Sequence, residues 1–297
     1  MQKTGIEYLT HTWNPIAMRC DRVSAGCKNC WHLRMAKRHA GNKTLHPELR
    51  EARGGGPFVL LDDELIAPLR TRKPGVIGVQ FMGDLFHKAV TDEQIAAVFG
   101  AMAMCENHTF VILTKRPGRM AEWFEWAGRR PAEQRDMLRN GAPVLGYMYE
   151  FAIRASNGAA NGFKDFFRPW PLPNIILGVS VEDQETADER IPLLLDTPAA
   201  RRVVSYEPAL GGVDFGRWFG IKWCHTGGLF GWRATIEAPN NHVSPIDGII
   251  CGPETGPGKR PMDLDWARSC RDQCTAAGVA FYYKGGELDG VRHEATP

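Results

Sequence analysis

Short apolar segments alternate with helical patterns along most of the chain, and this alternation restricts the fold more than any other feature. The apolar segments are rich in β-branched residues, as in "VIGVQFM", "TFVILTK", "NIILGVSV", "RRVVSYE" and "IDGIICG". Between them lie helical stretches such as "TDEQIAAVFGAMAMCEN", in which Thr91 precedes two acids at the expected helix start. Strands that are apolar throughout are typical of a sheet covered on both faces. The alternation therefore predicts an α/β fold with a mainly parallel sheet, either open or closed into a barrel.

The chain is long enough to bury a large core in one unit. Its 297 residues are 43% hydrophobic, and we predict a single domain over residues 1–297. Three loop-rich segments interrupt the alternation, and we interpret them as insertions at about 41–75, 141–173 and 224–245. No apolar run of about eighteen residues occurs, and the first residues lack the layout of an export signal. These features predict a cytoplasmic protein without a membrane segment.

Three of the eight cysteines fall within eleven residues, in the stretch "CDRVSAGCKNCW". Cys20, Cys27 and Cys30 have the spacing C-x6-C-x2-C, and in a reducing compartment they indicate thiols or metal ligands rather than disulfides. A structural zinc ion takes four ligands, and the nearest fourth candidate, His32, lies only two residues after Cys30. A [4Fe–4S] cluster held by three thiolates keeps one iron open for another ligand. The spacing favours the cluster; a zinc site and a chance grouping are the alternatives.

The stretch "TWNPIAMRCDRVSAGCKNCW" resembles the opening of a phage-associated family that is grouped with the radical S-adenosylmethionine (SAM) enzymes. The resemblance continues in the same order through "FMGDLFH", "TFVILTKRPGRM", "NIILGVSVEDQETADERIPLLL", "VVSYEPALGGVDF" and "IDGIICGPETGPGKRPM". It implies a partial (β/α)6 TIM-like barrel, with the three cysteines ligating three irons of a [4Fe–4S] cluster and SAM ligating the fourth. The sequence departs from the superfamily's common C-x3-C-x2-C spacing, and Asn29 stands where an aromatic residue often precedes the last cysteine.

The resemblance also implies which residues hold SAM. Gly83 would let the backbone approach the methionyl group, and Asp84 would accept a hydrogen bond from its ammonium, although a helix cap is an equal alternative for Asp84. The remaining expected contacts follow later strands, where polar side chains are expected at the carboxyl ends: Lys115, Ser180, Glu182, Ser205, Glu207 and Glu254. Ser180 and Glu182 would bind the ribose hydroxyls of the nucleoside, and Ser205 and Glu207 repeat this pattern. Converging carboxylates are also found in glycosidases, but that interpretation leaves the three cysteines unexplained.

The other cysteines carry less information. Cys270 and Cys274 lie four residues apart in an expected last helix, while Cys224 and Cys251 are isolated. A second cluster from these four is conceivable, but cysteine is also a common small core residue, and we favour the core interpretation.

Positive charge is concentrated at the start of the chain, although the net charge is only +2. Residues 1–60 contain ten Lys or Arg and four Asp or Glu, a net charge of +6. A solvated basic face is the common explanation for such a bias, and a phosphate-bearing partner is the functional one. Residues available to neutralise phosphates are Arg34, Lys37, Arg38, Lys43, Arg50 and Arg53.

The resemblance implies an enzyme that generates a 5′-deoxyadenosyl radical, with an electron donor such as flavodoxin or ferredoxin. The implied substrate is an amino-acid-modified thymine in phage DNA, with isomerisation of N-glycyl-thymidine as the example. Repair of a thymine lesion, similar to the spore photoproduct lyases, is an alternative within the same chemistry. A zinc- or cluster-stabilised nucleic-acid-binding protein without catalysis is the alternative of another class.

Overall fold

The computed structural model describes residues 1–128, 148, 150–154, 170–219, 222–225, 232–235 and 246–295. The chain divides into two compact units. The first unit comprises Met1–Asp21, Cys30–Ile112 and Glu122–Ile176, and the second comprises Arg22–Asn29, Leu113–Ala121 and Leu177–Pro297. The single domain expected from the sequence stays a prediction.

The strands form a mostly parallel sheet, which confirms the predicted α/β class. Its strand order is β1 (Gln2–Lys3), β2 (His11–Trp13), β5 (Gly75–Val79), β6 (His108–Thr114), β7 (Ile175–Val181), β8 (Arg201–Tyr206), β11 (Gly248–Cys251), β12 (Ala280–Leu288) and β13 (Val291–Glu294). The pairs β2/β5, β5/β6, β8/β11 and β11/β12 are parallel, whereas the end pairs β1/β2 and β12/β13 are antiparallel. Two short antiparallel pairs lie outside this sheet, β3 (Ile16–Ala17) with β4 (Val59–Leu60) and β9 (Lys222–His225) with β10 (Trp232–Thr235).

Helices separate most of the parallel strands, as the alternating pattern predicts. They are α1 (Trp31–Gly41), α2 (Pro47–Gly54), α3 (Asp62–Leu65), α4 (Asp92–Ala103), α5 (Pro117–Gly128), α7 (Gln184–Asp196), α8 (Gly216–Phe219) and α9 (Leu264–Ala277). Two 3₁₀ turns, η1 (Ala25–Cys27) and η2 (Pro68–Arg70), complete the described elements. None of the described helices is long and apolar enough to cross a membrane.

The ends of these helices follow from local sequence signals. Thr91 begins α4 with a capping box, in which its side chain accepts the Gln94 N–H and the Gln94 side chain accepts the Thr91 N–H. Asp183 begins α7 in the same way, with Thr186 as its partner. Gly278 ends α9 in the left-handed conformation, with φ of 68°, where a glycine costs least.

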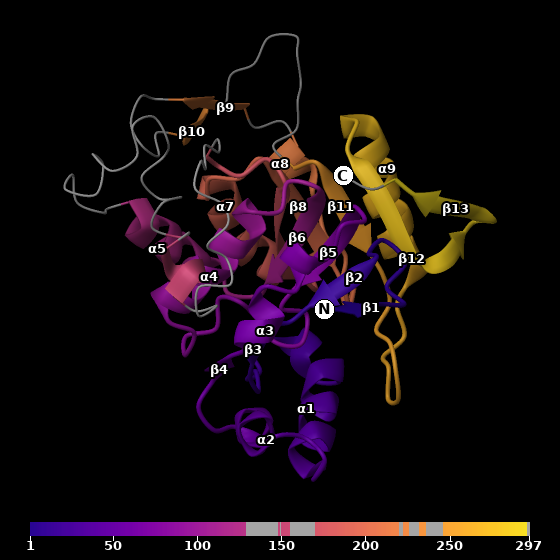
Figure 1. Ribbon diagram of the computed structural model, residues 1–297. Helices are drawn as coiled ribbons and strands as arrows, with labels where there is room; N and C mark the ends of the chain where they lie inside the picture. Colours follow the sequence, from indigo (N-terminus) through magenta and orange to yellow (C-terminus); the bar gives the residue numbers. More distant parts are fainter. Residues whose placement is uncertain are drawn as a thin grey trace. The chain divides into compact units, whose positions relative to one another are not determined.

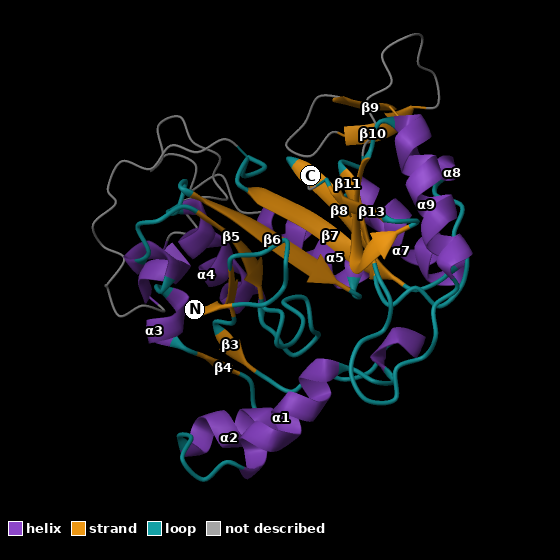
Figure 2. Ribbon diagram, turned by 90° about the vertical axis from the view of Figure 1, so that its right-hand side faces the viewer, coloured by secondary structure: helices purple, strands orange, loops and turns teal. Residues whose placement is uncertain are grey.

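In the first unit, aromatic side chains fill the space between strands and helices. Trp13, Phe99, Phe110 and Trp123 are almost fully buried, and the rings of Phe99 and Trp123 stack with centroids 4.4 Å apart. Helices α1 and α2 pack against each other as a hairpin that follows the last of the three cysteines (Figures 1 and 2). We call this pair the α1–α2 hairpin.

In the second unit, α9 packs on β11 and β12. Figure 1 shows α9 beside these C-terminal strands. Three of the outlying cysteines meet in this region, because Cys251 ends β11 while Cys270 and Cys274 lie on the buried side of α9. Each of the three is completely buried, as the core interpretation of these residues expects. Cys224 lies in β9, whose side chains are outside the described residues.

The first proposed insertion contains more regular structure than its sequence indicates. Within residues 41–75 lie α2, β4, α3 and η2, so this segment is not simply a loop. The second and third insertions, at 141–173 and 224–245, lie almost entirely outside the described residues.

Candidate functional site

The cysteine segment contributes residues to both compact units. Cys20 and Cys30 belong to the first unit, and Cys27 belongs to the second. All three are free thiols; Cys20 and Cys30 are half-buried, whereas Cys27 is buried.

In the first unit, a buried histidine of α1 holds the backbone at Cys20. The Cys20 N–H donates a hydrogen bond to Nε2 of His32, at 3.1 Å, and only 4% of His32 is exposed. Because Nε2 accepts, the proton of the neutral ring lies on Nδ1. Burial, reinforced by the charges of Arg53, His39 and Arg19, lowers the pKa of His32 to about 4. His32 is therefore neutral near pH 7 and remains an acceptor for the Cys20 N–H.

Arg53 of α2 ties together two backbone segments in the same unit. Its Nη1 donates to the carbonyl oxygens of Met18 and Met82, each at 3.1 Å. Met18 precedes Cys20, and Met82 precedes Gly83. The guanidinium is buried, and in these two contacts its acceptors are backbone carbonyl oxygens. Arg53 therefore holds the two backbone segments together through charge-assisted hydrogen bonds.

Gly83 and Asp84 have structural partners of their own. Gly83 has φ of 154°, and an added Cβ would lie 2.7 Å from Cγ of Met18, so only glycine fits without displacement. Oδ1 of the buried Asp84 accepts the Phe86 N–H at 3.0 Å, which forms a local turn. Asp84 is not the helix cap considered as the alternative, because the next helix, α4, begins at Asp92 with Thr91 as its N-cap. Binding of a methionyl group by Gly83 and Asp84 stays a prediction.

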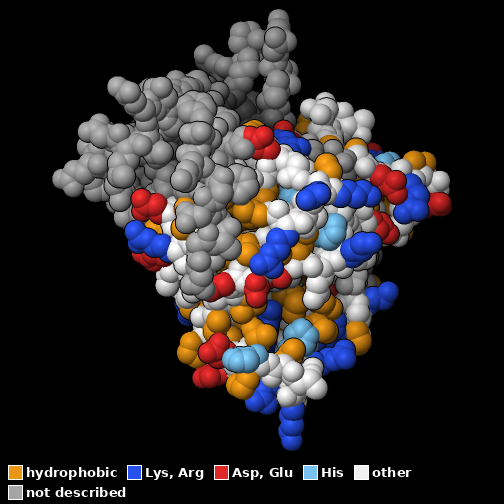
Figure 3. Space-filling view, viewed as in Figure 1, with side chains coloured by type: hydrophobic (Ala, Val, Ile, Leu, Met, Phe, Trp, Pro, Cys, Tyr) orange, Lys and Arg blue, Asp and Glu red, His pale blue; other side chains and the backbone are white. Residues whose placement is uncertain are grey.

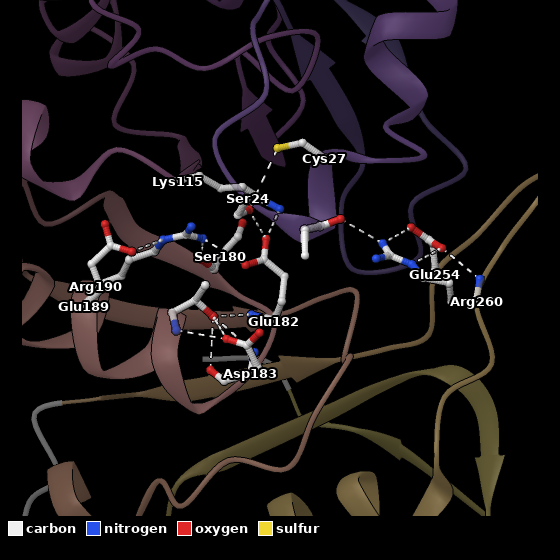
Figure 4. Close-up of polar contacts among 12 residues, drawn as sticks. Ser24, Cys27, Lys115, Ser180, Glu182, Asp183, Glu189, Arg190, Glu254 and Arg260 are labelled. Carbon is white, nitrogen blue, oxygen red and sulfur yellow. Dashed lines mark hydrogen bonds and ion pairs between the residues drawn. The ribbon is translucent and has the colours of Figure 1, made fainter.

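In the second unit, a fully buried carboxylate holds the cysteine segment at Ser24 (Figure 4). Glu182 follows β7, and its Oε1 accepts hydrogen bonds from Ser24 Oγ, at 2.7 Å, and from Lys115 Nζ. Its Oε2 pairs with Nη1 of Arg190, at 3.3 Å, from about two turns into α7. Glu182 is completely buried and Arg190 is 2% exposed. Both carboxylate oxygens thus already have partners, and a ribose hydroxyl would have to share or displace one of them.

Cys27 lies beside this carboxylate and its lysine. Ser24 Oγ is 4.0 Å from Cys27 Sγ. Burial opposes ionisation of the thiol, but the Lys115 ammonium and hydrogen bonds from Val23 and Ser24 outweigh it, so the pKa of Cys27 is lowered. The surroundings of Cys27 therefore favour the thiolate, which is the form that ligates metals.

Gly26 allows the turn that carries Cys27 to approach these groups. A Cβ at Gly26 would overlap Oε1 of Glu182 and lie 2.6 Å from Nζ of Lys115. No side chain can be added there unless the turn or the ion pair moves. The glycine before the second cysteine is thus explained by close packing against Glu182 and Lys115.

A second carboxylate holds the end of the same segment. Glu254 follows β11 and forms a two-point ion pair with Arg260, through Nη2 at 2.6 Å and Nε at 3.0 Å. Asn29 Nδ2 donates to Glu254 Oε2 at 2.9 Å, and Arg260 Nη2 donates to the Ala25 carbonyl at 3.0 Å. Hydrogen bonds from Arg260, opposed by burial and supported by Asn29, lower the pKa of Glu254 from 4.5 to about 2.

Two other predicted site residues, Ser205 and Glu207, lie away from these contacts, whereas Ser180 is joined to them. Ser205 is buried within β8, and Glu207 after it forms an ion pair with Lys284. The half-buried Ser180 is linked to the Glu182 group through its backbone, because its carbonyl accepts from Arg190 Nη1 at 2.7 Å. In the second unit, the structure therefore brings together Cys27, Lys115 and Glu182, and separately attaches Glu254 to the same segment.

A preformed metal site is not found in the described parts of the chain, where no three His, Cys, Asp or Glu side chains form a group that could hold a metal ion. Nε2 of His32 accepts the hydrogen bond from the Cys20 N–H. This nitrogen is therefore already occupied and would have to give up the hydrogen bond to ligate zinc. The donor chemistry of Cys20, Cys27 and Cys30 nevertheless fits a thiolate-ligated group, since all three are free thiols and the pKa of Cys27 is lowered.

Sequence reasoning missed most of the residues that hold the segment. The sequence patterns do not indicate Ser24, Arg190 or Arg260, and they mark Asn29 only as a departure from the superfamily. The hydrogen-bond partners of these residues lie up to 235 residues away in the chain. The one available signal was position, because Ser24 and Asn29 lie between the cysteines. His87 was also missed, although its Nε2 contacts Oδ1 of Asp21, the residue after Cys20, at 3.0 Å.

Comparison with known proteins gives a family but no activity. No curated protein matches the chain, and no solved structure matches it. A family model described as "Protein of unknown function (DUF5131)" matches residues 3–294. Because this match covers nearly the whole sequence, the chain belongs to the DUF5131 family.

Proposed function

We propose that this protein is a radical SAM enzyme in which Cys20, Cys27 and Cys30 hold a [4Fe–4S] cluster. The observation that carries the proposal is a segment with three free thiols within eleven residues, one of which lies where its thiolate is favoured. A three-thiolate cluster keeps one iron open, and the absence of a fourth ligand from the motif is thereby explained. When bound, the cluster and SAM supply a 5′-deoxyadenosyl radical that removes a hydrogen atom from the substrate.

The surrounding residues have distinct tasks in this proposal. Lys115 stabilises the Cys27 thiolate by its charge, and Glu182 fixes Lys115 by pairing with it. Glu254 holds Asn29 and thus the chain just before Cys30. Gly83 and Asp84 remain the proposed site for the methionyl group, and Ser180, Ser205 and Glu207 remain proposed contacts of the nucleoside. The finer fold in this proposal is the partial (β/α)6 barrel of the radical SAM type.

The proposed substrate is an amino-acid-modified thymine in phage DNA, with isomerisation of an N-glycyl group to a carbon attachment as the leading reaction. The support is the order of motifs that resembles the phage-associated family, from the cysteine segment to "CGPETGPGKRPM". An electron donor such as flavodoxin or ferredoxin would reduce the cluster in the host cytoplasm. Repair of a thymine lesion is the second candidate within the same chemistry.

The test of the chemistry begins with anaerobic purification and metal analysis. We expect brown protein with about four iron and four sulfide per chain, and release of 5′-deoxyadenosine after reduction with SAM. Cys27→Ala should lose the iron, whereas Cys105→Ala, which removes a buried thiol of the first unit, should keep it. Colourless protein with about one zinc per chain and no deoxyadenosine would overturn the proposal in favour of the non-catalytic alternative.

The test of the substrate uses nucleoside analysis of DNA. We expect the modified nucleoside to change in a host that carries the neighbouring modification genes with this protein, and to remain unchanged with Cys30→Ala. Deoxyadenosine production with no change in any thymidine derivative would reject the substrate and leave the radical chemistry standing.

A further inference from the structure

The outer face of helix α1 is rich in positive charge. Helix α1 contains no acid, and Arg34, Lys37 and Arg38 lie on its partly or fully exposed side. Its buried residues, His32 and Ala36, lie on the other side of the helix. Figure 3 shows Lys and Arg side chains and histidines over the hairpin. From residue 31 to residue 56 there are six Lys or Arg and two Glu, a net charge of +4.

An exposed tryptophan begins this face. Trp31 is the first residue of α1, follows Cys30 directly, and is 51% exposed. Among the described residues, the large exposed hydrophobic side chains are Val23, Trp31, Leu264 and Val291, of which Trp31 alone is aromatic. At helical spacing, Trp31, Arg34 and Arg38 form one row along the helix. We call Trp31, Arg34, Lys37 and Arg38 the basic face.

Among the described residues, no salt bridge involves Lys37, Arg38 or Lys43. The two glutamates of the hairpin lie on α2, where Glu48 is 3.9 Å from the ring of His46. Burial lowers the pKa of His39, and the charges of Arg53 and Arg38 lower it further, as expected where cations dominate.

We propose that the basic face binds a single-stranded segment of DNA, with Arg34, Lys37 and Arg38 contacting phosphates and Trp31 stacking on a base. A row of cations beside an exposed aromatic ring is the arrangement by which proteins hold single strands, because phosphates require charge and every base offers a stacking surface. A duplex would leave Trp31 without an unpaired base. The choice of DNA rests on the proposed function; the choice of a single strand rests on Trp31.

The basic face extends from the residue next to Cys30, so a strand bound along α1 ends beside one of the proposed cluster ligands. The row from Trp31 to Arg38 spans about 10 Å at about 1.5 Å per residue, which is long enough for more than one phosphate. We therefore expect Trp31 to bind a base close to the nucleotide that reacts.

The test measures binding of a fluorescent single-stranded oligonucleotide by anisotropy, with the full anaerobic protein, over a range of salt concentrations. The variant Lys37→Gln/Arg38→Gln removes two exposed cations of the basic face, and Arg72→Gln/Lys73→Gln removes two exposed cations elsewhere in the first unit. We expect the first variant to bind the oligonucleotide about tenfold more weakly and to reduce the magnitude of the slope of log K against log salt by about 1.4. The second variant should change neither the affinity nor the slope.

The stacking contact is tested by Trp31→Ala, Trp31→Phe and the matched control Leu264→Ala, which truncates another exposed hydrophobic side chain. We expect Trp31→Ala to weaken binding about tenfold, Trp31→Phe to retain most of it, and Leu264→Ala to retain all of it. Equal binding by both double variants, or tighter binding of a fully paired duplex than of the single strand, would overturn the inference. Wild-type protein that binds the single strand through the basic face but produces no deoxyadenosine would instead reject the proposed function and leave this inference standing.

Discussion

The cysteine segment is held differently in the two compact units. In the first unit, His32 and Arg53 hold the backbone around Met18 and Cys20, and a carboxylate takes no part in these contacts. In the second unit, the carboxylates of Glu182 and Glu254 hold the residues from Ser24 to Asn29. We call these the backbone anchor and the carboxylate anchor. The backbone anchor fixes where Cys20 begins the segment, and the carboxylate anchor also places a positive charge beside Cys27.

The difference shows which part of the segment depends on the long-range fold. The contacts of the backbone anchor join residues 12 and 35 positions apart, whereas Ser24 and Asn29 lie 158 and 225 positions from their acids. The carboxylate anchor therefore exists only once the ends of β7 and β11 are in place. Because removing a carboxylate from this anchor leaves buried cations without their acid, its removal should also have the larger energetic effect.

The largest effect is expected from breaking the carboxylate anchor at Glu182. Glu182→Ala would leave Arg190, which is 2% exposed, and Lys115, which is 18% exposed, without their shared acid. We expect the free energy of unfolding to fall by about 3–5 kcal/mol, measured by urea denaturation. The control Glu189→Ala, which removes a 65% exposed acid near Arg190, should change it by less than about 0.5 kcal/mol. Equal effects of the two variants would refute the carboxylate anchor.

The next effect comes from crowding the same anchor. Gly26→Ala introduces a Cβ against Glu182 and Lys115, and the turn before Cys27 must shift. We expect a loss of about 3 kcal/mol, at the upper end for overpacking, together with weaker retention of iron. Gly118→Ala in α5, where nothing lies within 4 Å of the new Cβ, should be neutral or slightly stabilising. If Gly26→Ala and Gly118→Ala changed the free energy of unfolding equally, the close packing of Gly26 against Glu182 and Lys115 would not contribute to stability.

A smaller effect is expected for the backbone anchor at His32. His32→Leu removes the acceptor of the Cys20 N–H and leaves a partly buried donor unpaired, at a cost of about 2 kcal/mol. His32→Gln offers an amide oxygen in place of Nε2 and should restore part of the loss. Hydrogen exchange at the Cys20 amide, followed by mass spectrometry, should be faster in His32→Leu than in His32→Gln. The same exchange rate in both variants would argue against this hydrogen bond.

The smallest effect is the acid sensitivity that Glu254 confers. Its pKa in the folded protein, about 2, lies below its usual 4.5, so its contribution to stability is complete above that usual value and is lost as the pH falls toward about 2. Between pH about 5 and about 3 this carboxylate should account for a loss of about 1–2 kcal/mol in the metal-free protein. Glu254→Gln should show a correspondingly shallower decline in urea denaturation over this interval. An unchanged decline would mean that the pairing with Arg260 and Asn29 does not set the pKa of Glu254.

Much of the fold could be predicted because its signals are local. The apolar strands and the Thr91 helix start follow from neighbouring residues, and the structure confirms them. The Asp183 helix start and the Gly278 helix end have equally local causes. The α1–α2 hairpin was underestimated, because "HPELREARGGG" contains turn residues at both ends and only two turns of helix between them.

The site could be predicted only in part. Glu182 and Glu254 were placed correctly at strand ends, since the carboxyl ends of parallel strands are a general location for functional side chains. Their immediate partners could not be predicted, because Arg190 and Arg260 are ordinary surface residue types whose burial depends on folding. The sequence pattern shows which strand ends carry polar residues, but it does not show which of these residues form hydrogen bonds or ion pairs with each other.

The central claim is that three thiolates hold a cluster with one iron open to SAM. Electron paramagnetic resonance of the reduced, anaerobically purified protein, recorded with and without SAM, tests it most directly. We predict the signal of a reduced [4Fe–4S] cluster that changes when SAM is added and that is absent from Cys27→Ala. A signal unaltered by SAM would contradict the open iron, and protein with zinc and no paramagnetic signal would contradict the cluster itself.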